Sequence, residues 1–180
     1  MTVRVRRAVA EDTAGYIALI KAILVEDPPV DTPYAPDEFD PAVEAMAARI
    51  DALNAADNSL LLVALQTALG PVIGALTCGG GPLKSNRHTT ELGVYVAQPW
   101  RDRGVGSALM REAIRWAQLN PVIERVELEV FAGNARAIHV YERFGFTHEG
   151  RKRRLYYRGG AAHDMLIMAL LLDKPPIESA

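Results

Sequence analysis

The chain has 180 residues, of which 49% are hydrophobic and 23% are charged, a balance typical of a globular protein and too apolar for a disordered one. The formal net charge of −2 at pH 7 gives no overall attraction to nucleic acid or to an anionic membrane. The single cysteine, Cys78, excludes an internal disulfide, and the length suits one domain over residues 1–180.

The N-terminal third predicts one strand followed by two helices. Residues 3–9 alternate between apolar and charged side chains, as in a strand, and apolar residues then recur at helical spacing over residues 11–24. The proline- and aspartate-rich segment 26–41 predicts a loop. At its end, Asp40 and Pro41 suit the start of a second helix, because aspartate caps a helix N-terminus and proline fits the first turn.

The rest of the chain predicts strands that alternate with helices. A Leu-Gly-Pro turn predicts a hairpin early in this region. The expected segments are the strands 60–65, 72–77 and 91–96, the helix 105–119, the strand 126–130, the helix 134–144, a solvated hairpin around 151–158, and the strand 165–172. The full order is therefore β-α-α-β-β-β-α-β-α-β-β, which predicts a single-domain α/β fold with helices flanking one central mixed sheet.

The stretch PWRDRGVGSAL, residues 99–109, has the glycines of a phosphate-binding turn between a strand and a helix. A dinucleotide fingerprint needs a small residue where Leu109 stands, and a P-loop is excluded at residues 79–85 because Leu83 replaces its glycine. Residues 101–106 match the pattern Gln/Arg-x-x-Gly-x-Gly/Ala. In such a turn the glycines let backbone N–H groups point inward, and the following helix adds its own free N–H groups and the positive end of its dipole. We therefore predict a pyrophosphate site in this turn.

A second motif, N-A-R-A-I-H-V-Y-E-R-F-G-F, occupies residues 134–146. Its spacing places Asn134, Ala137 and Tyr141 on one helical face. With both motifs in this order, the sequence resembles the GCN5-related N-acetyltransferase (GNAT) family. The resemblance runs from Glu91 through both motifs to the final strand, whereas the N-terminal third agrees in element order only.

The resemblance implies acetyl transfer from acetyl-CoA to an amine on a mostly antiparallel sheet, without a metal. The CoA pyrophosphate would lie on the turn, and the candidate residues there are Arg101, Arg103, Gly104, Val105, Gly106 and Ser107. The two arginines would add charge, and the alternative for one of them is a solvated turn residue. The pantetheine arm would lie between two separating strands, 92–96 and 126–131, and pair with backbone groups of Val94 and Val96. Asn134 would form a hydrogen bond near this arm, cap its helix, or do both.

Two residues are candidates for the proton transfers that amide formation requires. An alkyl amine with a pKa of about 10 must lose a proton, and the departing thiolate must gain one. The resemblance places Tyr141 as the acid, and the alternative is a core tyrosine that packs its helix onto the sheet. Glu91 shares a strand face with Gly93 and Tyr95 and is the candidate base, acting directly or through water. The alternative for Glu91 is a solvated carboxylate at a strand end.

The sequence leaves the identity of the acceptor open. We expect the primary amine of a small molecule, with a protein N-terminus or lysine side chain as the alternative. Outside enzymes, the alternative is a non-catalytic acetyl-CoA sensor. We expect acceptor contacts from the loop 26–41, with Asp31, Tyr34 and Glu38 as candidates.

The sequence predicts neither a secretory signal nor a membrane-spanning segment. The N-terminal stretch contains arginines but no apolar core. The longest apolar run, residues 165–172, is far shorter than the roughly 20 residues that a spanning helix needs, and it predicts a buried strand. We therefore expect a cytoplasmic protein without a nucleic-acid or membrane partner, whose apolar last strand suits a homodimer interface.

Overall fold

The computed structural model describes residues 3–26, 32–68 and 70–173. Its regular elements, besides two short 3₁₀ turns, are β1 (Arg4–Arg7), α1 (Thr13–Leu24), α2 (Val43–Ala55), β2 (Leu60–Leu65), β3 (Val72–Gly80), β4 (Thr89–Val96), α3 (Val105–Leu119), β5 (Arg125–Phe131), α4 (Ala135–Arg143), β6 (Thr147–Arg158) and β7 (Ala161–Leu171). This order is the predicted one, so the α/β fold class is confirmed. Within the described ranges, no helix combines the length and apolar character that crossing a membrane requires.

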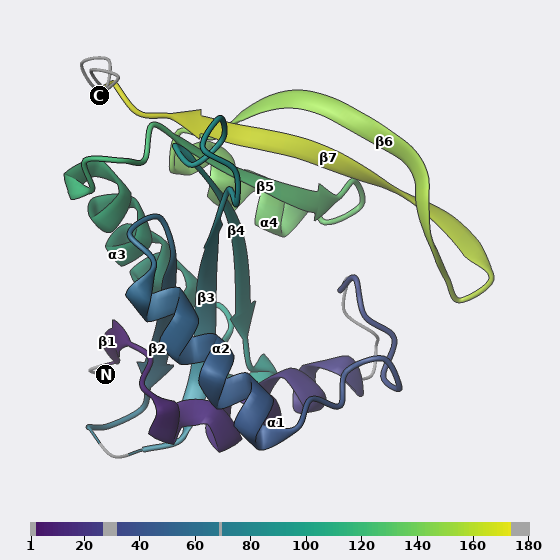
Figure 1. Ribbon diagram of the computed structural model, residues 1–180. Helices are drawn as coiled ribbons and strands as arrows, with labels where there is room; N and C mark the ends of the chain where they lie inside the picture. Colours follow the sequence, from purple (N-terminus) through teal and green to yellow (C-terminus); the bar gives the residue numbers. More distant parts are fainter. Residues whose placement is uncertain (1–2, 27–31, 69, 174–180) are drawn as a thin grey trace.

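The strands form one sheet with the order β1-β2-β3-β4-β5-β7-β6. Neighbouring strands are antiparallel except for β4 and β5, which run parallel. The parallel pairing joins residues 89–91 to residues 125–127, and the two strands then diverge (Figure 1). The mostly antiparallel sheet is therefore confirmed, and it opens at one seam near its middle.

Helices cover both faces of the sheet (Figure 1). On one face, α3 buries Val105 and Leu109 in the main core, which also contains Tyr141 of α4. On the other face, Ile50 of α2 packs against β2, and Ile23 of α1 packs against β3 and β4. Because both faces are covered, all six residues of β2 are buried, so this strand is a continuous apolar run rather than an alternating one.

The second helix begins later than the sequence predicts. The first residue of α2 is Val43, its N-cap is Ala42, and no side chain caps it. Asp40 instead forms an ion pair with Lys21 of α1. Because α1 lies alongside, the exposed carboxylate of Asp40 binds a cation on that helix rather than its own backbone. The predicted Asp40 cap is therefore wrong.

The two C-terminal strands form a long hairpin that extends past the rest of the sheet (Figure 1). The basic cluster 151–158 lies on β6, most of which is exposed, so the predicted solvated hairpin is confirmed. The predicted buried strand is only partly buried: Met165 and Met168 are in the core, whereas Leu171 is exposed. Leu171 is the last residue of β7 and pairs with Arg125 at the start of β5, at the end of the strand away from the hairpin turn.

Replacing Leu109 by Ala should lower the free energy of unfolding by about 2–5 kcal/mol, because its fully buried side chain would leave a cavity. Urea denaturation measures this change. Leu119 of the same helix is 73% exposed, so its replacement by Ala should cost less than about 0.5 kcal/mol. Equal losses for the two variants would contradict the packing of α3 described here.

Candidate active site

The candidate active site begins where β4 and β5 separate. In the β3–β4 pair, the Ala97 N–H donates a hydrogen bond to the Ile73 carbonyl. Because hydrogen-bonded pairs alternate along an antiparallel ladder, the backbone groups of Val94 and Val96 face away from β3, toward the gap. β5 pairs with β4 only as far as Glu91. The backbone groups that the sequence analysis assigns to cofactor binding therefore lie on an open strand edge.

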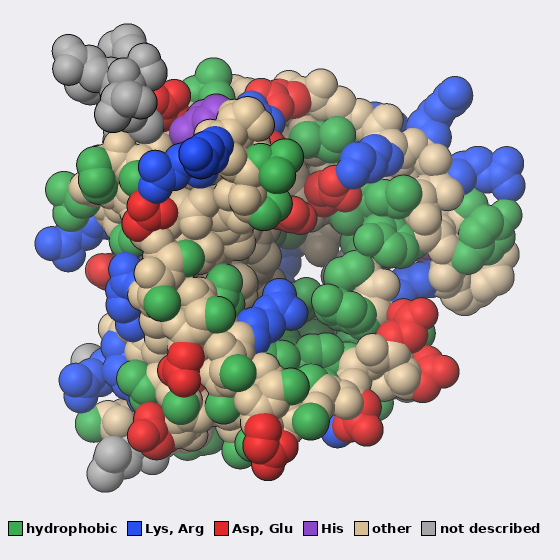
Figure 2. All heavy atoms as spheres, in the orientation of Figure 1, with side chains coloured by type: hydrophobic (Ala, Val, Ile, Leu, Met, Phe, Trp, Pro, Cys, Tyr) green, Lys and Arg blue, Asp and Glu red, His purple; other side chains and the backbone are tan. Residues whose placement is uncertain are grey.

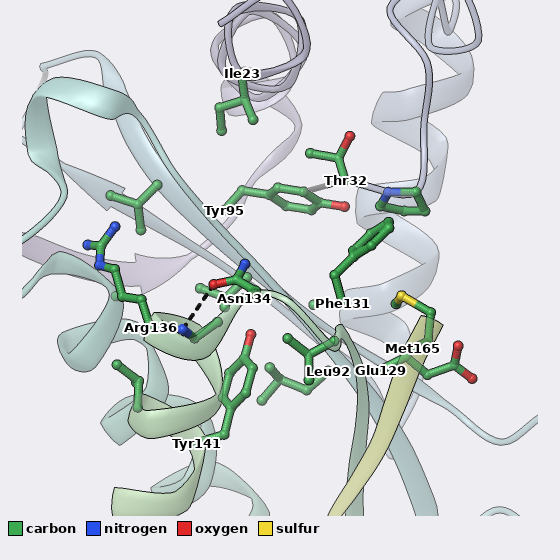
Figure 3. A pocket seen from close by; sticks show the side chains of 18 of the residues that line it. Ile23, Thr32, Leu92, Tyr95, Glu129, Phe131, Asn134, Arg136, Tyr141 and Met165 are labelled. Atoms are coloured by element: carbon green, nitrogen blue, oxygen red, sulfur yellow. Dashed lines mark hydrogen bonds between the residues drawn. The ribbon is translucent and has the colours of Figure 1, made fainter. Parts of the chain in front are cut away.

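A cleft of about 670 Å³ passes through this gap. Figure 2 shows the molecule hollowed between the β6–β7 hairpin and the segment that follows α1. The cleft is lined from β4, β5, the helices α3 and α4, the end of α1, and the C-terminal hairpin (Figure 3). Of the predicted site residues, it brings together Glu91, Val94, Val96, Arg101, Gly106, Asn134 and Tyr141.

The two ends of the cleft differ because side chains alternate along the strands. Leu92 and Val94 belong to the core on the α3 and α4 face, with Tyr141. Glu91 and Tyr95 point to the opposite face, where Tyr95 packs near the end of α1. The cleft thus connects a phenol on one face of the sheet with a carboxylate on the other.

The predicted phosphate turn forms the N-terminus of α3. Gly104 is the N-cap and has φ +80°, a conformation that glycine adopts without strain. A Cβ at Gly104 would have no heavy atom within 4 Å, so the turn leaves open space beside its backbone. The Val105 side chain is buried and anchors the turn. The N–H groups of residues 105–107 belong to the first helical turn, where no carbonyl of the same helix can accept them.

The two predicted arginines of the turn differ in their surroundings. Arg101 forms a two-point ion pair with Glu26, at 2.6 and 2.8 Å, and its Nε donates to the Val96 carbonyl. Arg103 is exposed, and its guanidinium lies over the Trp100 ring, 5.8 Å from the centroid. The guanidinium of Arg101 is thus bound by Glu26 and Val96, whereas Arg103 lies at the surface beside the turn.

The second motif positions Asn134 and Tyr141 at the start and near the end of α4. The Asn134 side-chain oxygen accepts a hydrogen bond from the Ala137 N–H at 3.1 Å, so the predicted N-cap is confirmed. The Tyr141 hydroxyl points into the cleft, toward Asn134 (Figure 3). Burial raises the pKa of Tyr141 to about 12, which keeps the phenol protonated at neutral pH. Tyr141 is therefore a core residue whose protonated hydroxyl faces the cleft.

Glu91 lies beside two other carboxylates. Partial burial raises the pKa of Glu91 above its ordinary value, the negative charges of Glu129 and Glu127 raise it further, and Lys152 opposes them. Lys152 forms an ion pair with Glu129. A carboxylate with a raised pKa is a stronger base than an ordinary one and accepts a proton more readily.

The end of the cleft beyond Glu91 is aromatic and apolar, which the sequence analysis missed. Tyr95 and Phe131 point toward the segment that contains Thr32 (Figure 3). The remaining side chains of this aromatic end are those of Ile23, Pro33, Tyr156 and Met165. They come from elements spread over the whole chain. The alternation along 91–96 and 126–131 could have indicated Tyr95 and Phe131, whereas no local pattern indicates the others.

The predicted acceptor loop contributes to the cleft through other residues than expected. Thr32 and Pro33 line the cleft, whereas Tyr34 and Glu38 are not among its lining residues. Glu38 accepts a hydrogen bond from the Ala35 N–H within its own turn. Asp31 lies outside the described residues. Arg158 of β6 donates hydrogen bonds to the Thr32 hydroxyl and the Tyr34 carbonyl, so the hairpin holds this segment over the cleft.

Comparison with known proteins gives a family and several relatives. The profile of the acetyltransferase (GNAT) family matches residues 19–146. The L-amino acid N-acetyltransferase AaaT of Escherichia coli is 39% identical over 100 residues, which cover 56% of this chain and 62% of that protein. An L-methionine sulfoximine/L-methionine sulfone acetyltransferase of Pseudomonas aeruginosa is 32% identical over 67% of this chain and 68% of its own. The matched region thus spans less than two thirds of the length of the E. coli relative.

A solved structure agrees with the fold over nearly the whole chain. The crystal structure of an acetyltransferase of the GNAT family from Streptococcus pneumoniae superimposes with a TM-score of 0.87 at 27% sequence identity. The match covers 95% of this chain and 99% of the other. The N-terminal third, where the sequence resemblance is limited to element order, therefore shares the fold as well.

Opposite changes in charge should move the pKa of Glu91 in opposite directions. Glu129→Gln should lower it, because a nearby negative charge is lost, and Lys152→Met should raise it, because the opposing positive charge is lost. Titration of the glutamate side-chain carboxyl signals by carbon NMR measures both changes. Shifts of the same sign, or no shift, would contradict the electrostatic environment assigned to Glu91.

Proposed function

The chain belongs to the acetyltransferase (GNAT) family, and we propose that it transfers the acetyl group of acetyl-CoA to the primary amine of a small molecule. The single observation that supports this most is the cleft that crosses the sheet between β4 and β5. This cleft joins the predicted phosphate turn and the buried phenol of Tyr141 on one face of the sheet to the carboxylate of Glu91 and the aromatic end on the other face. Two substrates entering from opposite faces would meet within it.

The residues at the gap fit acetyl-CoA. Pantetheine contains two amide groups, which complement the outward backbone groups of Val94 and Val96. The pyrophosphate suits the N-terminus of α3, where Val105, Gly106 and Ser107 supply N–H groups and Gly104 leaves open space. Arg103, at the surface beside this turn, would add positive charge, and Asn134 would lie near the arm.

The two proton transfers then fall to residues on opposite faces. Acetyl-CoA supplies the acetyl thioester; the new C–N bond forms as the C–S bond breaks. Glu91 would take a proton from the entering ammonium, directly or through water, because its raised pKa favours proton uptake. Tyr141, which its burial keeps protonated, would give a proton to the CoA sulfur, so that the thiol leaves uncharged. The second proton that the nitrogen releases as the amide forms would restore the phenol, so no negative charge stays in the dry site.

The aromatic end of the cleft indicates the kind of acceptor. Tyr95 and Phe131 with Ile23 offer a largely apolar surface next to Glu91. We propose that this surface receives an apolar group attached to the reacting amine. The E. coli relative is named for L-amino acids and the P. aeruginosa relative for L-methionine sulfoximine and L-methionine sulfone, which supports a small acceptor.

An assay of CoA thiol release against a panel of amines tests this function. The panel includes apolar and polar amino acids, polyamines and short peptides. We expect amine-dependent thiol release that is fastest with small amines bearing an apolar group. Faster release with peptides would favour a protein acceptor. Binding of acetyl-CoA without amine-dependent release from any member would make the protein a sensor and contradict the proposal.

Gly104→Asp should weaken acetyl-CoA binding by about a hundredfold or more, because it strains a residue at φ +80° and places a negative charge beside the pyrophosphate site. Isothermal titration calorimetry measures the affinity. Gly159 also has a positive φ, +54°, but lies in the turn between β6 and β7, so Gly159→Asp should leave acetyl-CoA binding unchanged. Similar affinities for both variants would contradict the phosphate turn.

Tyr141→Phe should lower kcat on the order of 100-fold while acetyl-CoA affinity changes less than about twofold, because only the proton donor is lost. Steady-state kinetics and calorimetry measure the two quantities. Tyr157 is 68% exposed on β6, so Tyr157→Phe is the matched control and should keep wild-type kcat. An unchanged kcat in Tyr141→Phe would assign the proton to another group.

A further inference from the structure

One ion pair ties the turn before α3 to the end of α1. Two nitrogens of the Arg101 guanidinium donate to the two carboxylate oxygens of Glu26, at 2.6 and 2.8 Å. The partners are 75 residues apart in the sequence. Their side chains are only 19% and 9% exposed. An arginine and a carboxylate in this two-point arrangement fix both distance and direction.

Arg101 also binds the strand edge that borders the gap. Its Nε donates to the Val96 carbonyl at 3.0 Å. Three of the five N–H donors of the guanidinium are thus engaged by the chain itself. A single side chain thereby connects the end of β4, the phosphate turn and the end of α1.

The end of α1 also forms one wall of the aromatic end of the cleft. Ile23 lines the cleft and packs near Tyr95. The Glu26 N–H donates a hydrogen bond to the Ile23 carbonyl at 3.3 Å. A displacement of Glu26 would therefore move Ile23, and with it the surface that receives the acceptor.

We propose that Arg101 is a positioning residue, which holds the phosphate turn and the end of α1 in place through Glu26 so that one ion pair sets the affinity for both substrates. In this role the charge of Arg101 is neutralised by Glu26 rather than used to attract the pyrophosphate. The identity of the two substrates rests on the proposed function. The inference therefore concerns how the two ends of the cleft are coupled.

Glu26→Gln separates the positioning role from a direct phosphate contact by the sign of its effect. If Arg101 positions the turn, loss of the carboxylate loosens the turn and weakens acetyl-CoA binding. If Arg101 instead binds the pyrophosphate by charge, loss of the neighbouring carboxylate leaves Arg101 more positive and strengthens binding. Arg101→Lys adds a second contrast, because lysine keeps the charge but lacks the two-point geometry.

The experiment measures the acetyl-CoA dissociation constant by calorimetry, and the acceptor KM and kcat by thiol release. The variants are Glu26→Gln, Arg101→Lys, Arg101→Gln and the double variant with Gln at both positions. We expect each to raise both the dissociation constant and the acceptor KM by about fivefold or more, with a smaller change in kcat. Because every variant breaks the same ion pair, the dissociation constant and acceptor KM of the double variant should be no higher than those of the single variants.

The double variant and one exposed ion pair supply the controls. Arg101→Gln leaves Glu26 buried without its partner and could unfold locally, whereas the double variant leaves no charge there. Lys21 of α1 pairs with Asp40 at the surface, so Lys21→Gln should change neither constant. Thermal melting of each variant separates altered binding from loss of the fold.

Three results would overturn the inference. Tighter acetyl-CoA binding in Glu26→Gln would make Arg101 a phosphate ligand, and unchanged binding in Glu26→Gln or in Arg101→Lys would remove the positioning role. A folded double variant with wild-type constants would show that the pair is dispensable. If wild-type protein binds acetyl-CoA but transfers no acetyl group, the proposed function fails while the calorimetric comparison still decides the role of Arg101.

Discussion

The site depends on the early end of the parallel pairing between β4 and β5. After Glu91 the backbone of β4 pairs with a strand on one side only. On the other side Val94 and the Val96 N–H face the gap, while the Val96 carbonyl accepts a hydrogen bond from Arg101. Backbone polar groups in a partly buried setting require partners. A ligand with amide groups can supply them, and the gap is wide enough to form a cleft. A fully paired sheet would leave no passage between its two faces.

The rest of the site follows from placing functional groups on both sides of that gap. Alternation along β4 places Glu91 and Tyr95 on the face of the sheet that α1 covers, and the opposite face holds Tyr141 of α4 and the N-terminus of α3. The proposed phosphate turn, the proposed acid and the proposed base thus line one passage although they lie on different elements. Burial raises the pKa of both Tyr141 and Glu91. The raised pKa keeps the phenol of Tyr141 protonated, whereas it makes the carboxylate of Glu91 a better base.

The sequence predicted the parts of the site that are contiguous. The glycine turn at 101–106 and the motif at 134–146 are each short, and each has a local physical reason for its residues, such as the positive φ at Gly104 or the cap at Asn134. The fold class followed from hydrophobic periodicity and element order. The family profile and the structural match confirm the resemblance on which the acetyl-CoA prediction rests.

Other features depend on contacts between distant segments, and for that reason the sequence did not predict them. Asp40 has the character of a helix cap, but Lys21 of a neighbouring helix binds it instead. The pairing of Arg101 with Glu26 joins segments 75 residues apart, and no local pattern encodes it. The aromatic end of the cleft likewise combines α1, both central strands and the hairpin.

Amide hydrogen exchange, measured by NMR with and without acetyl-CoA, tests most directly whether the open edge of β4 holds the cofactor. We predict slower exchange at Val94 and Val96 and at residues 105–107 when acetyl-CoA binds. The Ala97 amide, which already donates to the Ile73 carbonyl, should change much less. Unchanged exchange at Val94 and Val96, or equal slowing at Ala97, would contradict the assignment of the gap between β4 and β5 as the cofactor site.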